Sequence, residues 1–195
     1  MRQIARLPQK DRDALFQSTA AAIGINEAIV EKDFWVCWML DYLFHECPWK
    51  DALTFKGGTS LSKAFALIQR FSEDIDLILD WQVLGYAVDE PWRERSNTKQ
   101  DLFNKTVNEK TADFLDQIFL PVVNQFLSQN LQQGAHCYIE PHDLHTVRFL
   151  YPRSFTNEAI LQEIRLEIGS LAAWSPAKKQ SIMPYSAEQY GRLFS

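Results

Sequence analysis

The stretch from Phe55 to Asp80 constrains the fold more than any other, because its backbone preference changes three times within a short span. Leu53, Thr54 and Phe55 favour a strand, which Gly57-Gly58 then interrupts. Thr59 or Ser60 can cap a following helix, whose apolar residues recur at helical spacing as Leu61, Ala64, Phe65 and Ile68. The stretch therefore predicts a strand, a glycine turn and a helix in direct succession.

Glycines allow a backbone to approach an anion closely, and the free N–H groups at a helix start favour phosphate. The candidate phosphate-binding residues are Gly57, Gly58, Thr59 and Ser60. Three nearby basic residues could offset triphosphate charge: Lys56, Lys63 and Arg70. The structural alternative is an ordinary strand-to-helix turn. A Walker-type P-loop is excluded, because that motif requires Gly-Lys-Ser/Thr after four spacer residues and Gly57 to Lys63 does not contain it.

Asp74-Ile75-Asp76 follows the predicted helix at the start of an alternating strand pattern. Alternation places Asp74 and Asp76 on one face, with Ile75 on the other. Two adjacent carboxylates favour a divalent cation with oxygen ligands, Mg²⁺ or Mn²⁺. The alternative is the solvated face of an edge strand.

In this order, the glycine pair, the hydroxyl residues, one helix and Asp-x-Asp resemble the signature of the polymerase-beta-like nucleotidyltransferase superfamily. More narrowly, Lys56 to Lys63 followed by Arg70 to Leu77 resembles the AbiEii/AbiGii-type nucleotidyltransferase toxins of bacterial toxin–antitoxin and phage-defence systems. Glu31-Lys32-Asp33, followed by aromatic residues, is similar to the same family. The resemblance covers about Asn26 to Gly169.

The resemblance implies an α/β fold in the α+β sense, with helices packed on a small twisted sheet that is mixed or antiparallel. It implies metal-dependent transfer of an NMP from an NTP to an acceptor hydroxyl, on RNA such as tRNA or on a protein. It also implies a cognate antitoxin as partner. The superfamily takes a third acidic ligand from a later alternating strand, and Glu167 within Ile160 to Ile168 fits that position best, with Glu163 as competitor. The resulting catalytic and metal-binding set is Asp74, Asp76 and Glu167.

Two alternatives to this function stay open. A catalytically silent module could keep the fold and sense nucleotides or bind a protein. A metal-dependent nuclease could use the same carboxylates, although it has no evident use for Gly57-Gly58-Thr59-Ser60.

The remaining chain predicts supporting elements. A helix from Pro8 to Ile23 ends at Gly24, and Asn26 caps a mostly apolar helix that reaches about Glu46. Gln100 to Leu131 predicts a long helix that Pro121 kinks or divides. Strands are expected at 136–140 and 146–151. Lys32 is expected at the surface, with a position turned toward the triphosphate as the alternative.

We expect one nucleotidyltransferase domain over 1–195. It comprises N-terminal helices at 1–50, a catalytic core at 51–170 and a C-terminal segment at 171–195 without the family's helical C-terminal region. The net charge of −5 excludes a general electrostatic affinity for nucleic acid. The few cysteines and the lack of a signal peptide or a long apolar run favour a cytoplasmic protein with no membrane contact.

Overall fold

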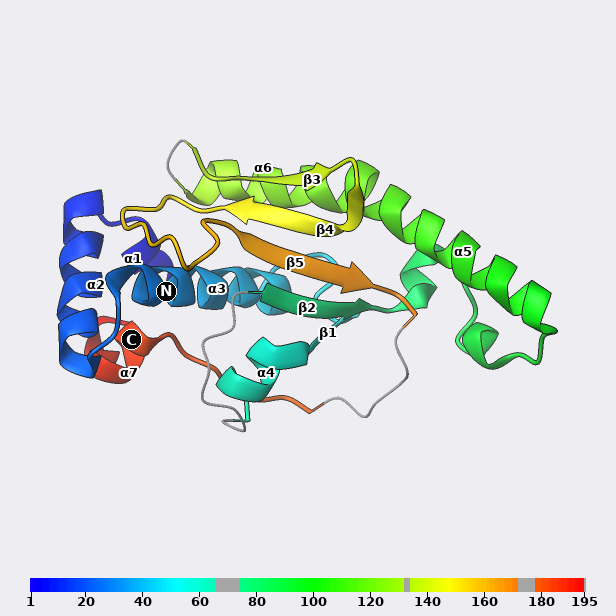
Figure 1. The fold of residues 1–195 in the computed structure, drawn as a ribbon, viewed down its shortest axis with the longest axis horizontal. Coiled ribbons are helices and arrows are strands. Elements are labelled where there is room, and N and C mark those ends of the chain that lie inside the picture. Colours follow the sequence, from blue (N-terminus) through cyan, green and yellow to red (C-terminus); the bar gives the residue numbers. More distant parts are fainter. Residues whose placement is uncertain (66–73, 132–133, 172–177, 195) are drawn as a thin grey trace.

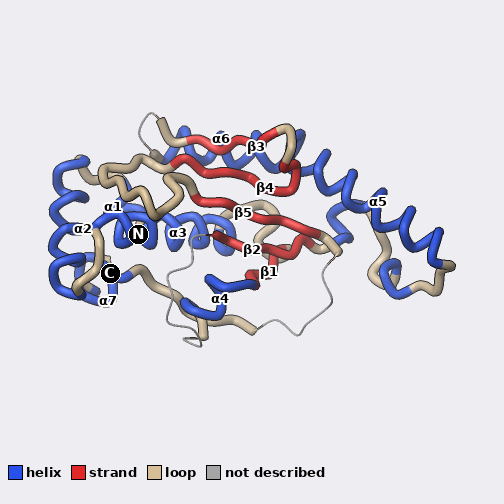
Figure 2. Tube along the Cα trace, viewed as in Figure 1, coloured by secondary structure: helices blue, strands red, loops and turns tan. Residues whose placement is uncertain are grey.

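The computed structural model describes residues 1–65, 74–131, 134–171 and 178–194, in which helices surround one mixed sheet (Figures 1 and 2). The α-helices are α1 (Arg2–Ala5), α2 (Gln9–Ile23), α3 (Glu27–His45), α4 (Gly57–Lys63), α5 (Asn97–Phe114), α6 (Leu120–Asn130) and α7 (Tyr185–Gln189). Short 3₁₀ turns occupy Trp81–Leu84, Glu90–Trp92 and Gly191–Leu193. The strands are β1 (Leu53–Lys56), β2 (Asp74–Leu79), β3 (His136–Glu140), β4 (Asp143–Leu150) and β5 (Ile164–Gly169).

The sheet has the strand order β1-β2-β5-β4-β3. β2 and β5 pair in parallel, and the other neighbours are antiparallel. The predicted mixed sheet with helices packed on it is thereby confirmed. β2 lies inside the sheet with β1 outside it, so the alternative of an edge strand for Asp74 and Asp76 is wrong.

One face of the sheet carries the core and the other remains polar. Ile75, Leu77 and Leu79 of β2 are fully buried, and so are Ile164 and Leu166 of β5. α3 and α6 lie on this apolar face (Figure 1). The rings of Trp35 and Trp38 on α3 contact that of Phe149 on β4, and α6 adds Phe126 against Trp38. Strict alternation along the strands therefore leaves the opposite face to polar side chains.

The N-terminal helices follow the sequence pattern closely. Gly24 ends α2 in the left-handed conformation with a φ of 72°, and the Asn26 side chain accepts a hydrogen bond from the Ala28 N–H at 2.9 Å. Both predicted helix boundaries are confirmed, because both depend on residues adjacent in sequence.

Other boundaries differ from expectation. The long helix divides through a π-helical turn at Leu115–Phe119, directly before the turn that holds Pro121. α4 begins at Gly57, with Lys56 in the capping position, so the prediction of a Thr59 or Ser60 cap is wrong. The helix starts earlier because Gly57 itself adopts a φ of 73° and turns the chain. Leu61 and Phe65, two of the apolar residues that recur at helical spacing, are 40% and 44% exposed.

β5 begins at Ile164, four residues later than the alternating pattern suggested. Ile160 is buried but precedes the strand, so its apolar character reflects packing rather than sheet pairing. None of the described helices combines the length and the apolar character needed to cross a membrane.

Candidate active site

The polar face of the sheet carries two rows of side chains that run across the strands. In the first, the Asp76 row, each residue is in register with the next: Lys56 on β1, Asp76 on β2, Glu167 on β5 and Thr146 on β4. Neighbours in register share a face and stand about 5 Å apart. The parallel pairing of β2 with β5 thus brings two predicted acidic residues side by side although they are distant in sequence.

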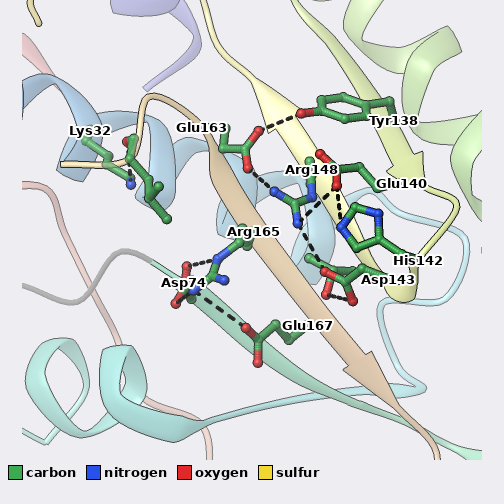
Figure 3. Close-up of polar contacts among 12 residues, drawn as sticks. Lys32, Asp74, Tyr138, Glu140, His142, Asp143, Arg148, Glu163, Arg165 and Glu167 are labelled. Atoms are coloured by element: carbon green, nitrogen blue, oxygen red, sulfur yellow. Dashed lines mark hydrogen bonds and ion pairs between the residues drawn. The ribbon is translucent and has the colours of Figure 1, made fainter. Parts of the chain in front are cut away.

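The second row, the Arg165 row, lies two residues along each strand from the first. It consists of Asp74 on β2, Arg165 on β5, Arg148 on β4 and Tyr138 on β3. The Arg165 guanidinium donates to both oxygens of Asp74, from Nε at 3.0 Å and from Nη2 at 2.7 Å (Figure 3). The same Nη2 lies 3.8 Å from Oε1 of Glu167. Arg165 therefore links the two rows.

Negative charge accumulates where the rows meet. Partial burial raises the pKa of Glu167 above its ordinary value, the nearby Asp74 and Asp76 raise it further, and Arg165 acts in the opposite direction. Nζ of Lys56 lies 4.0 Å from Oδ1 of Asp76 at the edge of the row. The arrangement thus favours either a proton on Glu167 or an added cation among the carboxylates.

Glu163, the competitor for the third acidic position, lies elsewhere. It precedes β5, accepts a hydrogen bond from the Tyr138 hydroxyl at 2.7 Å and forms an ion pair with Arg148 (Figure 3). Asp143 supports the same arginine, with its Oδ2 3.2 Å from Nη2. Of the two glutamates, Glu167 is the one that neighbours Asp76 in register.

The glycine turn contacts the acidic strand directly. A Cβ placed on Gly57 would stand only 1.8 Å from Oδ2 of Asp76, so no other residue fits without moving that carboxylate. The Thr59 hydroxyl donates a hydrogen bond to the backbone carbonyl of Asp74. Gly57 and Thr59 thus position the two aspartates, a function that the predicted phosphate contacts did not include.

The other predicted phosphate-binding residues occupy varied positions. Ser60 is buried in α4, next to the half-buried Gly58. Lys63 forms an ion pair with the buried Asp33 of α3, with 2.5 Å between Nζ and Oδ1, and its ammonium lies 3.9 Å from the centre of the Tyr185 ring. Its charge is thus directed toward α3 and α7. Arg70 lies outside the described residues.

Glu31-Lys32-Asp33 on α3 forms a second charged group, called here the α3 triad. Glu31 accepts hydrogen bonds from the backbone N–H groups of Ser154 and Phe155, at 2.8 and 2.9 Å. Lys32 is 0% exposed and donates to the carbonyl of Leu161 at 2.8 Å. The expected surface position of Lys32 is therefore wrong, because its side chain is buried and its ammonium donates to a distant backbone carbonyl.

Asp33 completes the triad by accepting a hydrogen bond from the Tyr185 N–H at 2.7 Å in addition to the ion pair with Lys63. Three consecutive residues thus fasten four distant segments to one helix. Sequence reasoning missed this role for Glu31 and Asp33, although three charges in a helix that is otherwise strongly apolar were an available signal.

An open hollow of about 380 Å³ adjoins the Asp76 row. Its lining residues come from β1, β4 and β5: Lys56, Asp143, His145, Thr146, Glu167, Ile168 and Gly169. Glu167 and Lys56 therefore face a space that a small ligand or one end of a larger one could enter.

The chemistry of Asp74, Asp76 and Glu167 suits Mg²⁺ or Mn²⁺, because all three offer carboxylate oxygens at neighbouring register positions. Within the described part of the chain, no three acidic, histidine or cysteine side chains converge closely enough to hold a metal ion. Both oxygens of Asp74 accept hydrogen bonds from Arg165, so a cation at this donor set would compete with the guanidinium.

A known protein family matches most of the chain. Residues 40–194 match the model of the nucleotidyl transferase AbiEii toxin family of type IV toxin–antitoxin systems. No curated protein and no solved structure matches the chain. The match continues beyond Gly169 through the C-terminal residues, so the expectation that the likeness ends there is wrong. With the glycine turn and the acidic rows inside the matched region, the chain belongs to the AbiEii nucleotidyl transferase toxin family.

Proposed function

We propose that this protein transfers an NMP from an NTP to an acceptor hydroxyl, with Mg²⁺ or Mn²⁺ held by Asp76, Glu167 and Asp74. The observation that carries the proposal is the register of Asp76 with Glu167 beside an open hollow. Two carboxylates in this position stabilise a cation, and a cation bound to phosphate neutralises the charge of the transferring group.

The chain's own residues supply binding and orientation. Lys56, at the edge of the Asp76 row, is placed to neutralise triphosphate charge, because it lines the hollow together with Glu167. Gly57 and Thr59 hold the backbone and the carboxylates of β2 in place. These carboxylates are therefore already positioned when substrate binds, which lowers the entropy cost of binding. The predicted phosphate contacts of Gly58, Ser60, Lys63 and Arg70 belong to this proposal as well.

Glu167 is the candidate general base for the acceptor hydroxyl. Its carboxylate is in register with Asp76 and lines the hollow, so it can accept the proton of a hydroxyl that enters there. Its side chain is 45% exposed, so an acceptor can reach it from the hollow. The acceptor is RNA, such as tRNA, or a protein hydroxyl.

The family supports a role as a toxin. We propose that a cognate antitoxin restrains it, that the reaction takes place in the cytoplasm and that the system serves phage defence. Expression of the wild-type chain should therefore slow bacterial growth, and a neighbouring antitoxin gene should relieve the effect.

Transfer of a labelled nucleotide to total RNA and to total protein, with each of the four NTPs and Mg²⁺, tests the proposal. Asp76→Asn and Glu167→Gln should each lower transfer by on the order of 100-fold and abolish toxicity. Glu163→Gln is the matched control, because it changes the rival glutamate and should retain activity. Equal toxicity of the wild type and Asp76→Asn contradicts transferase chemistry as its cause. Nucleotide binding without transfer to either acceptor pool favours the sensing module instead.

A further inference from the structure

The pair formed by Arg165 and Asp74 engages a proposed ligand of the cation more closely than the other ion pairs do, since Lys56 lies 4.0 Å from Asp76 and Arg165 lies 3.8 Å from Glu167. Its two hydrogen bonds engage both carboxylate oxygens in the planar, bidentate geometry that is the strongest arrangement for these groups. Both side chains nevertheless remain partly exposed, 31% for Arg165 and 27% for Asp74. Solvent and ligands can therefore compete for the pair.

Arg148 provides the contrast within the same row. It is surrounded by Glu163, Asp143 and Glu140, and its side chain is only 16% exposed. None of these three carboxylates belongs to the proposed cation site. Releasing Arg148 would leave them without compensation, whereas releasing Arg165 leaves Asp74 free for a cation.

We propose that Arg165 binds the triphosphate of the NTP and that Asp74 holds it in place until nucleotide and cation arrive together. Asp74 and Asp76 would then hold the cation, whose positive charge would take the place of the guanidinium beside Asp74. The freed guanidinium then donates two parallel hydrogen bonds to phosphate oxygens, for which its planar fork is suited. No covalent bond changes in this exchange. The inference deepens the proposed function and depends on it.

Position favours the nucleotide over the phosphate backbone of an RNA acceptor. Arg165 lies between Asp74 and Glu167, with Nη2 3.8 Å from Oε1 of Glu167, and so stands among the carboxylates that are proposed to hold the reacting phosphate. The protein's net charge of −5 also argues against a broad backbone-binding surface.

The exchange predicts opposite effects of one substitution on two ligands. In Arg165→Gln, Mn²⁺ alone should bind about tenfold more tightly, because the competing charge is gone. Inorganic tripolyphosphate with Mg²⁺, a probe that needs no knowledge of the base, should bind about tenfold more weakly, because a charge-assisted hydrogen-bond pair is lost. Calorimetry measures both. Arg148→Gln is the matched control and should change each affinity less than twofold.

Arg165→Lys is a second variant that separates lost binding from misfolding, because it keeps the positive charge and removes only the planar guanidinium. It should leave Mn²⁺ binding near that of the wild type and still weaken tripolyphosphate binding. Unchanged tripolyphosphate affinity in Arg165→Gln overturns the inference, even if Mn²⁺ binds more tightly. A loss confined to a single-stranded RNA without a 5′ triphosphate overturns it in favour of acceptor binding. If the wild type binds none of the four NTPs with Mg²⁺, the proposed function itself fails.

Discussion

The α3 triad and the Asp76 row are both groups of neighbouring charges, but their charges are compensated to very different degrees. In the triad, Glu31 accepts two backbone N–H groups, Lys32 donates to a carbonyl and Asp33 is paired with Lys63. In the row, Nζ of Lys56 lies 4.0 Å from Oδ1 of Asp76, Nη2 of Arg165 lies 3.8 Å from Oε1 of Glu167, and the two carboxylates are neighbours in register.

This difference separates architecture from ligand binding. A buried charge remains tolerable only when protein groups partner it, so the triad, in which each side chain contacts distant segments, holds the fold together. A partly exposed carboxylate beside another carboxylate gains from an added cation, so the row is suited to a ligand. The following experiments test the distinction, beginning with the largest expected change in stability.

Asp33→Asn should lower the free energy of unfolding by about 3–5 kcal/mol at pH 7, because it leaves the ammonium of Lys63 buried without its counter-charge. Urea unfolding measures the loss. Asp41→Asn, on the same helix, is the control. Asp41 pairs with His45 at 3.0 Å on the surface, and its loss should cost less than about 0.5 kcal/mol. Similar losses in the two variants contradict the structural role of the triad.

The triad should also make stability depend on pH. Burial raises the pKa of Glu31 from 4.5 to about 7, against the effect of its two N–H donors, and that of Asp33 from 3.8 to about 6 despite Lys63. The folded protein therefore keeps protons that the unfolded chain releases. Stability should be fully present below the unfolded pKa values and should fall as pH rises through the folded ones.

For Glu31 the decrease between pH 4.5 and 7 should reach about 3 kcal/mol. Melts across this range, with Glu31→Gln for comparison, measure it. In Glu31→Gln, most of the decrease in stability above pH 6 should disappear. The decrease below pH 6 that comes from Asp33 should remain. An identical pH dependence of wild type and variant contradicts the raised pKa of Glu31.

Gly57→Ala tests the contact between the glycine turn and the row. A left-handed alanine costs about 1–2 kcal/mol, and here the new Cβ must also displace the Asp76 carboxylate. Gly24→Ala is a matched control, since Gly24 has nearly the same φ, 72° against 73°, and no heavy atom within 4 Å of the added Cβ. Both variants should lose stability, and only Gly57→Ala should weaken Mn²⁺ binding. Equal Mn²⁺ affinity in the two contradicts the positioning role of Gly57.

Asp76→Asn should have the smallest effect and the opposite sign. With chelator present, it should melt at the same temperature as the wild type or slightly higher, because it relieves a like-charge pair worth on the order of 1 kcal/mol. Millimolar Mg²⁺ should reverse the order, since only the wild type gains the free energy of binding. A variant clearly destabilised in chelator would assign Asp76 to the architecture instead.

The parts of this picture that were predictable depend on neighbours in sequence. Gly24 and Asn26 mark helix boundaries through their own conformation and side chain, and Asp74 and Asp76 share a face through alternation alone. Glu167 was predicted by resemblance and alternation together, and the late start of β5 separates it from Glu163.

The remainder depends on partners that are far away in the chain. Lys32 binds a carbonyl 129 positions later, and Arg165 binds Asp74 across 91 positions. No local sequence pattern encodes such a pair. Lys32 was therefore predicted at the surface from its charge alone, and no role was predicted for Arg165. Lys63 was predicted to offset phosphate charge because it is basic and follows the glycine turn, whereas its ion pair with Asp33 joins residues from two helices and has no local signal.

The strand order has a consequence for how the protein folds during synthesis. Among the strands that the structure describes, β5 is the last to be made, yet it lies in the middle of the sheet, between β2 and β4. The antiparallel pairs β1–β2 and β3–β4 can each form earlier, but joining them requires the closure of a long loop, which is slow. A growing chain therefore carries the glycine turn and both aspartates well before it can bring Glu167 to them. The candidate site assembles only when β5 inserts and closes the gap between the two pairs.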